Sequence, residues 1–166
     1  PTTFGDLKLV EINNGSIFCS CLKSGFIKTL VAFLEQPIDV LFIEASGLAD
    51  PSSMRALLDQ INEQAAQKGL VSRRYDYRGS ICIVDCTTFL EYCEVLIPTT
   101  NQVIKSNFIL VNKTDQVDQT RIADIHEHIR TLNPKSLVYD TTYSRVPLSE
   151  LEEKLTIGDD SLPSSN

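Results

Sequence analysis

Residues 107–115 read NFILVNKTD, and this stretch decides the fold. It contains a continuous apolar run over 108–111 and turns polar at Asn112. Short uninterrupted apolar runs are typical of strands buried on both faces, as they are in a parallel sheet. The polar residues that follow the run would then lie at the carboxyl end of a buried strand.

Other stretches of the chain have the same character. We predict strands over 39–45 (DVLFIEA), 79–86 (GSICIVDC) and 136–140 (SLVYD), and a shorter one over 7–12 (LKLVEI). Apolar residues at helical spacing alternate with them and predict the helices 22–36, 51–68, 88–106 with a break at Pro98, 119–132 and 147–155. Strands that alternate with helices build a parallel sheet. We therefore predict an α/β fold with a doubly wound, mostly parallel sheet and helices on both faces.

The length of 166 residues suits one domain. We place this domain at 1–157 and expect the polar residues 158–166 to form a disordered tail. The 15 basic and 22 acidic residues give a net charge of −7, which argues against binding to nucleic acid because that requires clustered positive charge. No apolar run is long enough to span a membrane, and no signal peptide opens the chain. Five irregularly spaced cysteines indicate reduced thiols in a cytoplasmic protein.

Ligands of such sheets bind outside the carboxyl ends of the strands. The polar residues that end the apolar runs should therefore converge there: Glu44 with Ser46 and Gly47, then Asp85, then Asn112 with Lys113 and Asp115. The alternative is that these residues only cap helices and form turns. We adopt that alternative for Asp50 and Asp118, each of which precedes a predicted helix.

The residue types at 112–115 suit a purine base. A carboxylate only accepts hydrogen bonds, so Asp115 can take two from the N1–H and amino group of guanine, a pair that adenine does not offer. The stem of Lys113 can lie on the base while its ammonium stays solvated, and Asn112 can bond the base and hold neighbouring loops. The order Asn-Lys-Thr-Asp after a buried strand resembles the Asn-Lys-x-Asp signature of P-loop GTPases.

Residues 42–51, FIEASGLADP, narrow this resemblance. They are similar to the E-[ST]-[ST]-G-L-A-[DE]-P segment of the CobW/HypB/UreG family of P-loop GTPases, with Ala45 in place of one hydroxyl residue. The resemblance extends in order from about residue 7 to 140 and is nearest to the CobW-like subgroup. It implies that Glu44 acts near Mg²⁺ and that Gly47 lies near the γ-phosphate of GTP.

The family's phosphate-binding motif, GxxxxGK[ST], does not occur in the sequence. Since that motif precedes the Asn-Gly loop in the family, we expect this chain to begin after it, either as a fragment or through a natural loss. We expect the chain alone not to hydrolyse GTP, and we identify no residue that activates water.

Residues 14–21, NGSIFCSC, occupy the place of a proposed metal-binding loop, Asn-Gly-Cys-x-Cys-Cys, in CobW-like proteins. Only Cys19 matches one of the three cysteines, and Cys21 is additional. On an extended segment the two thiolates would point the same way and could share an ion such as Zn²⁺. A redox or structural role for the two thiols is the alternative.

Two interpretations of function follow. In the first, the chain is part of a CobW-like GTPase that uses GTP or GDP with Mg²⁺ to insert or traffic Zn²⁺ or Co²⁺ for a metalloprotein client. In the second, it is a non-catalytic interaction module that kept the fold and lost nucleotide chemistry. The identity of the metal, the client and the oligomeric state stay open, as does a third interpretation, an unrelated doubly wound enzyme.

Overall fold

The structure, a computed structural model, describes residues 2–4, 7–11, 20–45, 47, 53–70, 74–147 and 149–151. The chain forms two compact units: unit 1 comprises Pro1–Ala49 and Ser53–Tyr75, and unit 2 comprises Asp50–Ser52 and Asp76–Asn166. The predicted tail over 158–166 lies outside the described residues, as does most of the predicted helix over 147–155, of which residues 149–151 are helical.

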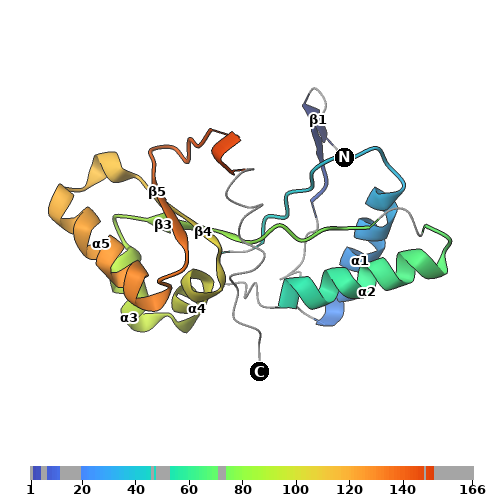
Figure 1. The fold of residues 1–166 in the computed structure, drawn as a ribbon, viewed down its shortest axis with the longest axis horizontal. Coiled ribbons are helices and arrows are strands. Elements are labelled where there is room, and N and C mark those ends of the chain that lie inside the picture. Colours follow the sequence, from blue (N-terminus) through green and yellow to red (C-terminus); the bar gives the residue numbers. More distant parts are fainter. Residues whose placement is uncertain are drawn as a thin grey trace. The chain divides into compact units, whose positions relative to one another are not determined.

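Unit 1 contains two short strands and two helices (Figure 1). Strand β1 (Thr2–Phe4) pairs antiparallel with β2 (Leu7–Leu9), which occupies the first half of the strand predicted over 7–12. Helix α1 (Ser20–Leu34) confirms the helix predicted over 22–36, and α2 (Met54–Gln67) confirms the one predicted over 51–68. The core of this unit comes from the apolar faces of the two helices: Phe26, Ile27, Leu30, Val31, Leu34, Met54, Leu57, Leu58, Ile61 and Ala65.

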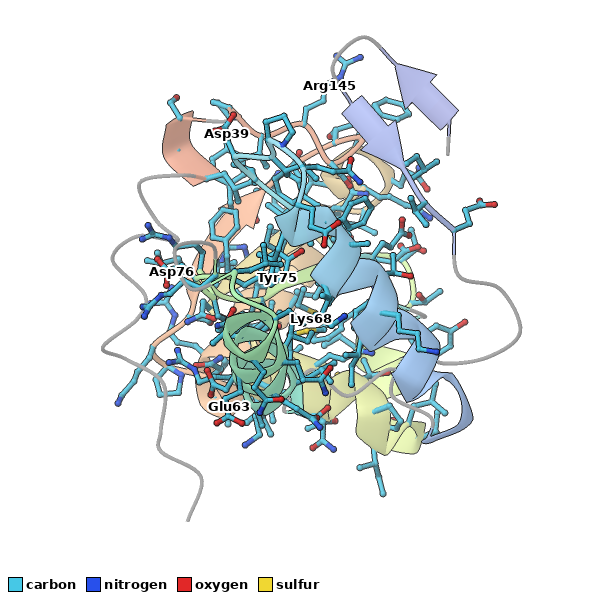
Figure 2. The ribbon with its side chains drawn as sticks, turned by 90° about the vertical axis from the view of Figure 1, so that its right-hand side faces the viewer. Asp39, Glu63, Lys68, Tyr75, Asp76 and Arg145 are labelled. Carbon is cyan, nitrogen blue, oxygen red and sulfur yellow. The ribbon has the colours of Figure 1, made fainter. Side chains whose placement is uncertain are left out.

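Tyr75 joins the two helices of unit 1 and is labelled in Figure 2. Its hydroxyl donates to the carbonyl of Leu30 in α1 at 2.7 Å. Its backbone N–H and C=O both bond the side-chain amide of Asn62 in α2, at 2.8 and 3.0 Å. Burial raises the pKa of Tyr75 to about 12, so the phenol stays a neutral donor at physiological pH.

Helix α2 ends at Gln67, close to the predicted end at 68, and is followed by Gly69, whose φ of +83° places it in the left-handed region. The Gly69 N–H bonds the carbonyl of Ala66, and the Leu70 N–H bonds that of Ala65. This pair of bonds is the Schellman arrangement, which satisfies carbonyls that a helix end leaves without partners. The N-cap position is Ser53, and its side chain makes no capping bond. The cap predicted at Asp50 lies outside the described residues.

The prediction of a buried strand over 39–45 is wrong. These residues have no regular secondary structure, and the side chains of Val40 and Phe42 are 59% and 61% exposed. An apolar run favours a strand only where a neighbouring strand supplies hydrogen bonds and a packed layer covers its side chains. Local composition alone therefore did not determine the conformation of this segment.

Unit 2 contains a parallel sheet with the strand order β3-β4-β5 (Figure 1). Strand β4 (Phe108–Asn112) lies between β3 (Ile81–Asp85) and β5 (Leu137–Asp140), and all three confirm predicted strands. Because the strands are parallel and in register, Asp85 pairs with Asn112 at the carboxyl end of the sheet. The three-stranded parallel sheet with its connecting helices confirms the predicted α/β class.

Three helices pack on one face of this sheet. Helices α3 (Phe89–Val95) and α4 (Ile97–Lys105) confirm the predicted break near Pro98, and α5 (Gln119–Leu132) follows the short 3-10 turn η2 (Thr114–Gln116). Asp118 caps α5 as predicted, because its carboxylate accepts a bond from the Arg121 N–H at 2.8 Å. The core joins alternate residues of β3 and β4 to the helices: Cys82, Val84, Cys86, Phe89, Val103, Ile109, Val111, Ile125 and Ile129. Cys82 and Cys86 are buried in this core, where their thiols pack as small apolar groups.

The opposite edge of the sheet is held by two asparagines. The Asn133 amide donates to the carbonyls of Val103, Ile104 and Ser106 at 2.8 to 3.2 Å, which satisfies the C-terminal end of α4. The Asn107 side-chain oxygen accepts from the Ser80 N–H at 3.0 Å. Both residues therefore stabilise the fold at the amino edge, away from the carboxyl ends of the strands.

Candidate functional site

The carboxyl edge of the unit 2 sheet brings together two groups of polar residues that the sequence places 27 or more positions apart. Asp85 ends β3, and Asn112 ends β4 directly beside it. Lys113 follows Asn112 with φ 64° and ψ 33°, a left-handed conformation that is uncommon for residues other than glycine. The prediction that Asp85 converges with the 112–115 segment is therefore confirmed.

The sequence analysis expected the ammonium of Lys113 to be solvated. In the structure it also contacts a carboxylate. Its Nζ lies 2.5 Å from Asp85 Oδ2, and the two side chains are 43% and 35% exposed. The hydrogen bond and charge of Asp85 raise the pKa of Lys113. The ion pair with Asp85 adds to the expected solvation, because the side chain of Lys113 stays partly exposed.

The carboxylate of Asp85 is engaged through both oxygens. Oδ1 accepts bonds from the Thr87 N–H at 2.9 Å and from the Thr87 hydroxyl at 2.7 Å. Partial burial acts to raise the pKa of Asp85, but the bonds from Lys113 and Thr87 outweigh it, and the pKa lies below its usual value. Asp85 is therefore a carboxylate at neutral pH, and its direction is set by Thr87.

Asn112 fastens a second loop to this edge. Its side-chain oxygen accepts a bond from the Ser144 N–H at 2.9 Å, which confirms the expectation that Asn112 holds a neighbouring loop. Thr114 strengthens the connection, since its N–H and hydroxyl both bond the carbonyl of Thr141, at 3.3 and 3.2 Å. The NKTD segment and the loop after β5 thus form one hydrogen-bonded assembly.

Sequence reasoning missed that loop, residues 141–145. Tyr143 and Ser144 both have positive φ, 56° and 52°, and the Tyr143 side chain is 79% exposed. The guanidinium of Arg145 lies 5.8 Å from the centre of the Tyr143 ring. One available signal was position, because the loop directly follows the third parallel strand and had to emerge at the same edge.

Asp115, the residue predicted to read the base, lies in the turn η2 and is exposed. No partner for its carboxylate lies among the residues that the structure describes. Asp115 therefore differs from Asp85, whose two carboxylate oxygens both accept hydrogen bonds, although both residues belong to the same edge of unit 2. An exposed carboxylate beside a hydrogen-bonded loop is free to accept two bonds from a ligand.

Arg121 is a further residue of this region, and no sequence motif pointed to it. From the first turn of α5, its guanidinium donates to the carbonyls of Cys86 and Thr87 at 2.8 and 3.1 Å and to both oxygens of Glu91. The bonds to the carbonyls hold the turn that follows β3. The bonds to Glu91, opposed by partial desolvation, raise the pKa of Arg121, which is charged at any physiological pH.

The remaining predicted site residues belong to unit 1. Glu44 and Gly47 are exposed; Glu44 lies within the irregular segment 39–45, and Gly47 follows it. Cys21 lies in the first turn of α1, so the expectation of an extended segment is wrong for this residue: the helix begins two residues before the predicted start. Cys19 and Ser46 lie outside the described residues. The convergence of Glu44 and Gly47 with the 112–115 segment stays a prediction.

The described residues contain neither a metal-ligand cluster nor a membrane-spanning helix. No three histidine, cysteine or acidic side chains are grouped in a way that could hold a metal ion within that part of the chain. Among the same residues, no helix has both the length and the apolar character that crossing a bilayer requires.

Comparison with known proteins gives concordant matches. Residues 3–140 match the family described as CobW/HypB/UreG, nucleotide-binding domain. The chain is similar to the "Zinc-regulated GTPase metalloprotein activator 1" of Dictyostelium discoideum, with 27% identity over 166 residues that cover 86% of this chain and 34% of that protein. The protein of the same name from Saccharomyces cerevisiae is 24% identical over 164 residues, covering 86% and 36%. The chain thus spans about a third of the length of these relatives. No solved structure matches.

Proposed function

The chain belongs to the CobW/HypB/UreG family of nucleotide-binding domains, and from this premise we propose that it is the guanine-binding part of a GTPase that handles a metal ion. The observation that carries the proposal is the carboxyl edge of unit 2. There, Asn112, Lys113 and Asp115 follow the central parallel strand, and the exposed Asp115 carboxylate has no partner among the described residues. This is the edge at which ligands of parallel sheets bind.

The geometry supports a separate task for each of the three residues. Asp115 accepts the N1–H and amino hydrogens of guanine, and adenine cannot donate this pair. Asn112 already accepts one bond on its side-chain oxygen, from the Ser144 N–H, so its two amide hydrogens are the groups it offers most readily to a ligand. The stem of Lys113 covers a face of the base while its ammonium is held by Asp85. In this arrangement Asp115 determines which base is bound, and the other two determine how firmly it is held.

Mg²⁺ bound to the nucleotide would neutralise charge on the phosphates during transfer to water. Of the described residues, Glu44 fits such an ion by its chemistry, because it is an exposed carboxylate, and hard cations prefer oxygen ligands. Asp85 fits less well, since both of its oxygens are already bound. We assign Glu44 to the ion, directly or through water, and Gly47 to the region of the γ-phosphate, both by family resemblance.

Zn²⁺ or Co²⁺ would be cargo, delivered to a metalloprotein client. The names of the two relatives, which describe zinc regulation and metalloprotein activation, support this extension. Cys19 and Cys21 are the proposed ligands, completed by groups beyond this pair because Zn²⁺ takes four ligands in structural sites. The free thiols of Cys82, Cys86 and Cys93 are consistent with the reducing cytoplasm that we propose as the compartment.

The test is a titration of the full-length protein with GTP and ATP in the presence of Mg²⁺, followed by a measurement of phosphate release. We expect GTP to bind more tightly than ATP and to be hydrolysed. Equal binding of both nucleotides would contradict the role of Asp115. Absence of any nucleotide binding would reject the proposal and favour a non-catalytic interaction module.

A further inference from the structure

We propose that Asp85 is a positioning residue of the base site, which acts by holding the Lys113 side chain in one direction. The inference rests on the proposed function and deepens it, because it adds a residue outside the NKTD segment to the determinants of nucleotide affinity. It is carried by the contact of Asp85 Oδ2 with Lys113 Nζ at 2.5 Å, between the ends of two neighbouring strands.

The carboxylate of Asp85 is oriented before it meets Lys113. Thr87 donates two hydrogen bonds to Oδ1, from its N–H and from its hydroxyl, and so leaves Oδ2 to face Lys113. The carbonyl of Thr87 is in turn held by the Arg121 guanidinium at 3.1 Å. A chain of contacts therefore runs from α5 through the turn after β3 to the lysine.

A purely structural role explains this arrangement less well. Ion pairs between partly exposed side chains contribute little to folding, and this pair is 43% and 35% exposed. Their effect on geometry is larger, because a lysine side chain has four rotatable bonds and otherwise samples many rotamers. Lys113 is also in the left-handed backbone conformation, so its side chain leaves the loop in a direction that ordinary β or α backbone would not give. Ordering a side chain before the ligand arrives lowers the cost of binding.

A double-mutant cycle on the full-length protein tests the proposal. The affinities of a fluorescent GDP analogue are measured for wild type, Asp85→Asn, Lys113→Met and the double variant. Asp85→Asn keeps the side-chain shape and removes the charge that holds Lys113. We expect each single variant to weaken binding about tenfold, which corresponds to about 1.4 kcal/mol. The double variant should bind no more weakly than Lys113→Met alone, because Asp85 acts only through Lys113.

A second readout separates positioning from base recognition. Lys113 covers the face of the base, so Asp85→Asn should weaken GDP and IDP by the same factor and leave their affinity ratio unchanged. Asp140→Asn is the matched control. It removes the charge of another exposed carboxylate at this edge, which contacts His126 at 2.6 Å instead of Lys113. This control should bind GDP as wild type does, and thermal unfolding of each variant verifies the fold.

The outcomes distinguish the inference from the proposed function. If wild type binds GDP and Asp85→Asn binds it equally well, the positioning role is wrong and the proposed function stands. Additive losses in the double variant would likewise overturn the positioning role. If Asp85→Asn fails to fold, Thr87→Val replaces it in the cycle, because that variant removes one of the bonds that orient the carboxylate and should show a smaller loss of the same kind. If wild type binds no guanine nucleotide, both proposals fail.

Discussion

The side-chain oxygen of Asn112 accepts a hydrogen bond from the backbone N–H of Ser144 at 2.9 Å. This bond links the loop after β4 to the loop after β5 across 32 positions of sequence. It holds Ser144 in a left-handed conformation, φ 52°, next to Tyr143 in the same region. The loop over 141–145 therefore depends on a side chain of the segment proposed to bind guanine.

Asn112→Ala should release this loop. The net value of one such bond is about 0.5–1.5 kcal/mol, so hydrogen exchange of the Ser144 amide should accelerate by roughly two- to tenfold. Exchange measured residue by residue in the full-length protein checks this. Thr131→Ala is the control. It removes the exposed hydrogen bond from the Thr131 hydroxyl to the Glu127 carbonyl within α5, and it should leave exchange of the Ser144 amide unchanged. Unchanged exchange at Ser144 would show that other contacts hold the loop.

Asp115→Asn should change which base is preferred. Guanine would lose an acceptor for its two donors, at a cost of about 1.5–3 kcal/mol, while the new amide can donate to the additional carbonyl of xanthine. Competition among GDP, XDP and ADP measures the shift. Asp118→Asn is the matched control three residues along, since asparagine is also a good N-cap and Asp118 caps α5. A preference that is the same in wild type and Asp115→Asn would contradict base recognition by Asp115.

Gly79→Ala should destabilise the protein by about 1–3 kcal/mol. Gly79 has φ +130°, and a Cβ added there would lie 2.7 Å from the side-chain oxygen of Asn107. Gly25→Ala is the opposite case, because nothing lies within 4 Å of an added Cβ in α1, and alanine favours a helix interior by about 0.5–1 kcal/mol. In chemical denaturation, the free energy of unfolding should be lower than wild type for Gly79→Ala and higher for Gly25→Ala. Equal stability of both would refute the steric argument at Gly79.

Stability should decrease at alkaline pH through Cys82. Burial, with a smaller effect of Cys93, raises the pKa of Cys82 to about 12. Between the ordinary thiol pKa of about 8.5 and this value, the unfolded chain has lost the proton that the folded chain retains. The free energy of unfolding therefore falls as pH rises through this window, by at most about 1.4 kcal/mol per pH unit. Cys82→Ala should flatten that slope in denaturation curves from pH 9 to 11, and identical slopes would show that Cys82 does not contribute.

Replacement of Cys19 and Cys21 by serine should remove bound zinc. Serine is a poor substitute for a thiolate ligand, so the double variant should contain one fewer Zn²⁺ per chain of the full-length protein, measured by elemental analysis. Cys93→Ser is the control, because it removes a partly buried thiol of unit 2. Equal zinc content in wild type and the double variant would reject the proposed ligands and leave a redox or structural role.

The site was predictable where the signal was local. Asn112, Lys113 and Asp115 were identified because they directly follow an apolar run, and the structure places them at a strand end. The sequence also predicted that Asp85 would lie near them, but not which side chains would bond one another. Asp85 and Lys113 are 28 positions apart, and Arg121 reaches Cys86 across 35. Which side chain meets which depends on the pairing of strands and the packing of α5.

The sequence by itself determined the parallel strands of unit 2, the helices with the cap of α5 at Asp118, and the interruption near Pro98. Each depends on periodicity or on a residue whose preferred backbone conformation acts within a few positions. Only the tertiary structure decided that 39–45 is irregular, that Asp85 engages Lys113, and that Asn112 holds Ser144. The physical reason is that hydrogen bonds and burial need a partner, and the partner of a residue is set by how distant segments pack rather than by its neighbours in sequence.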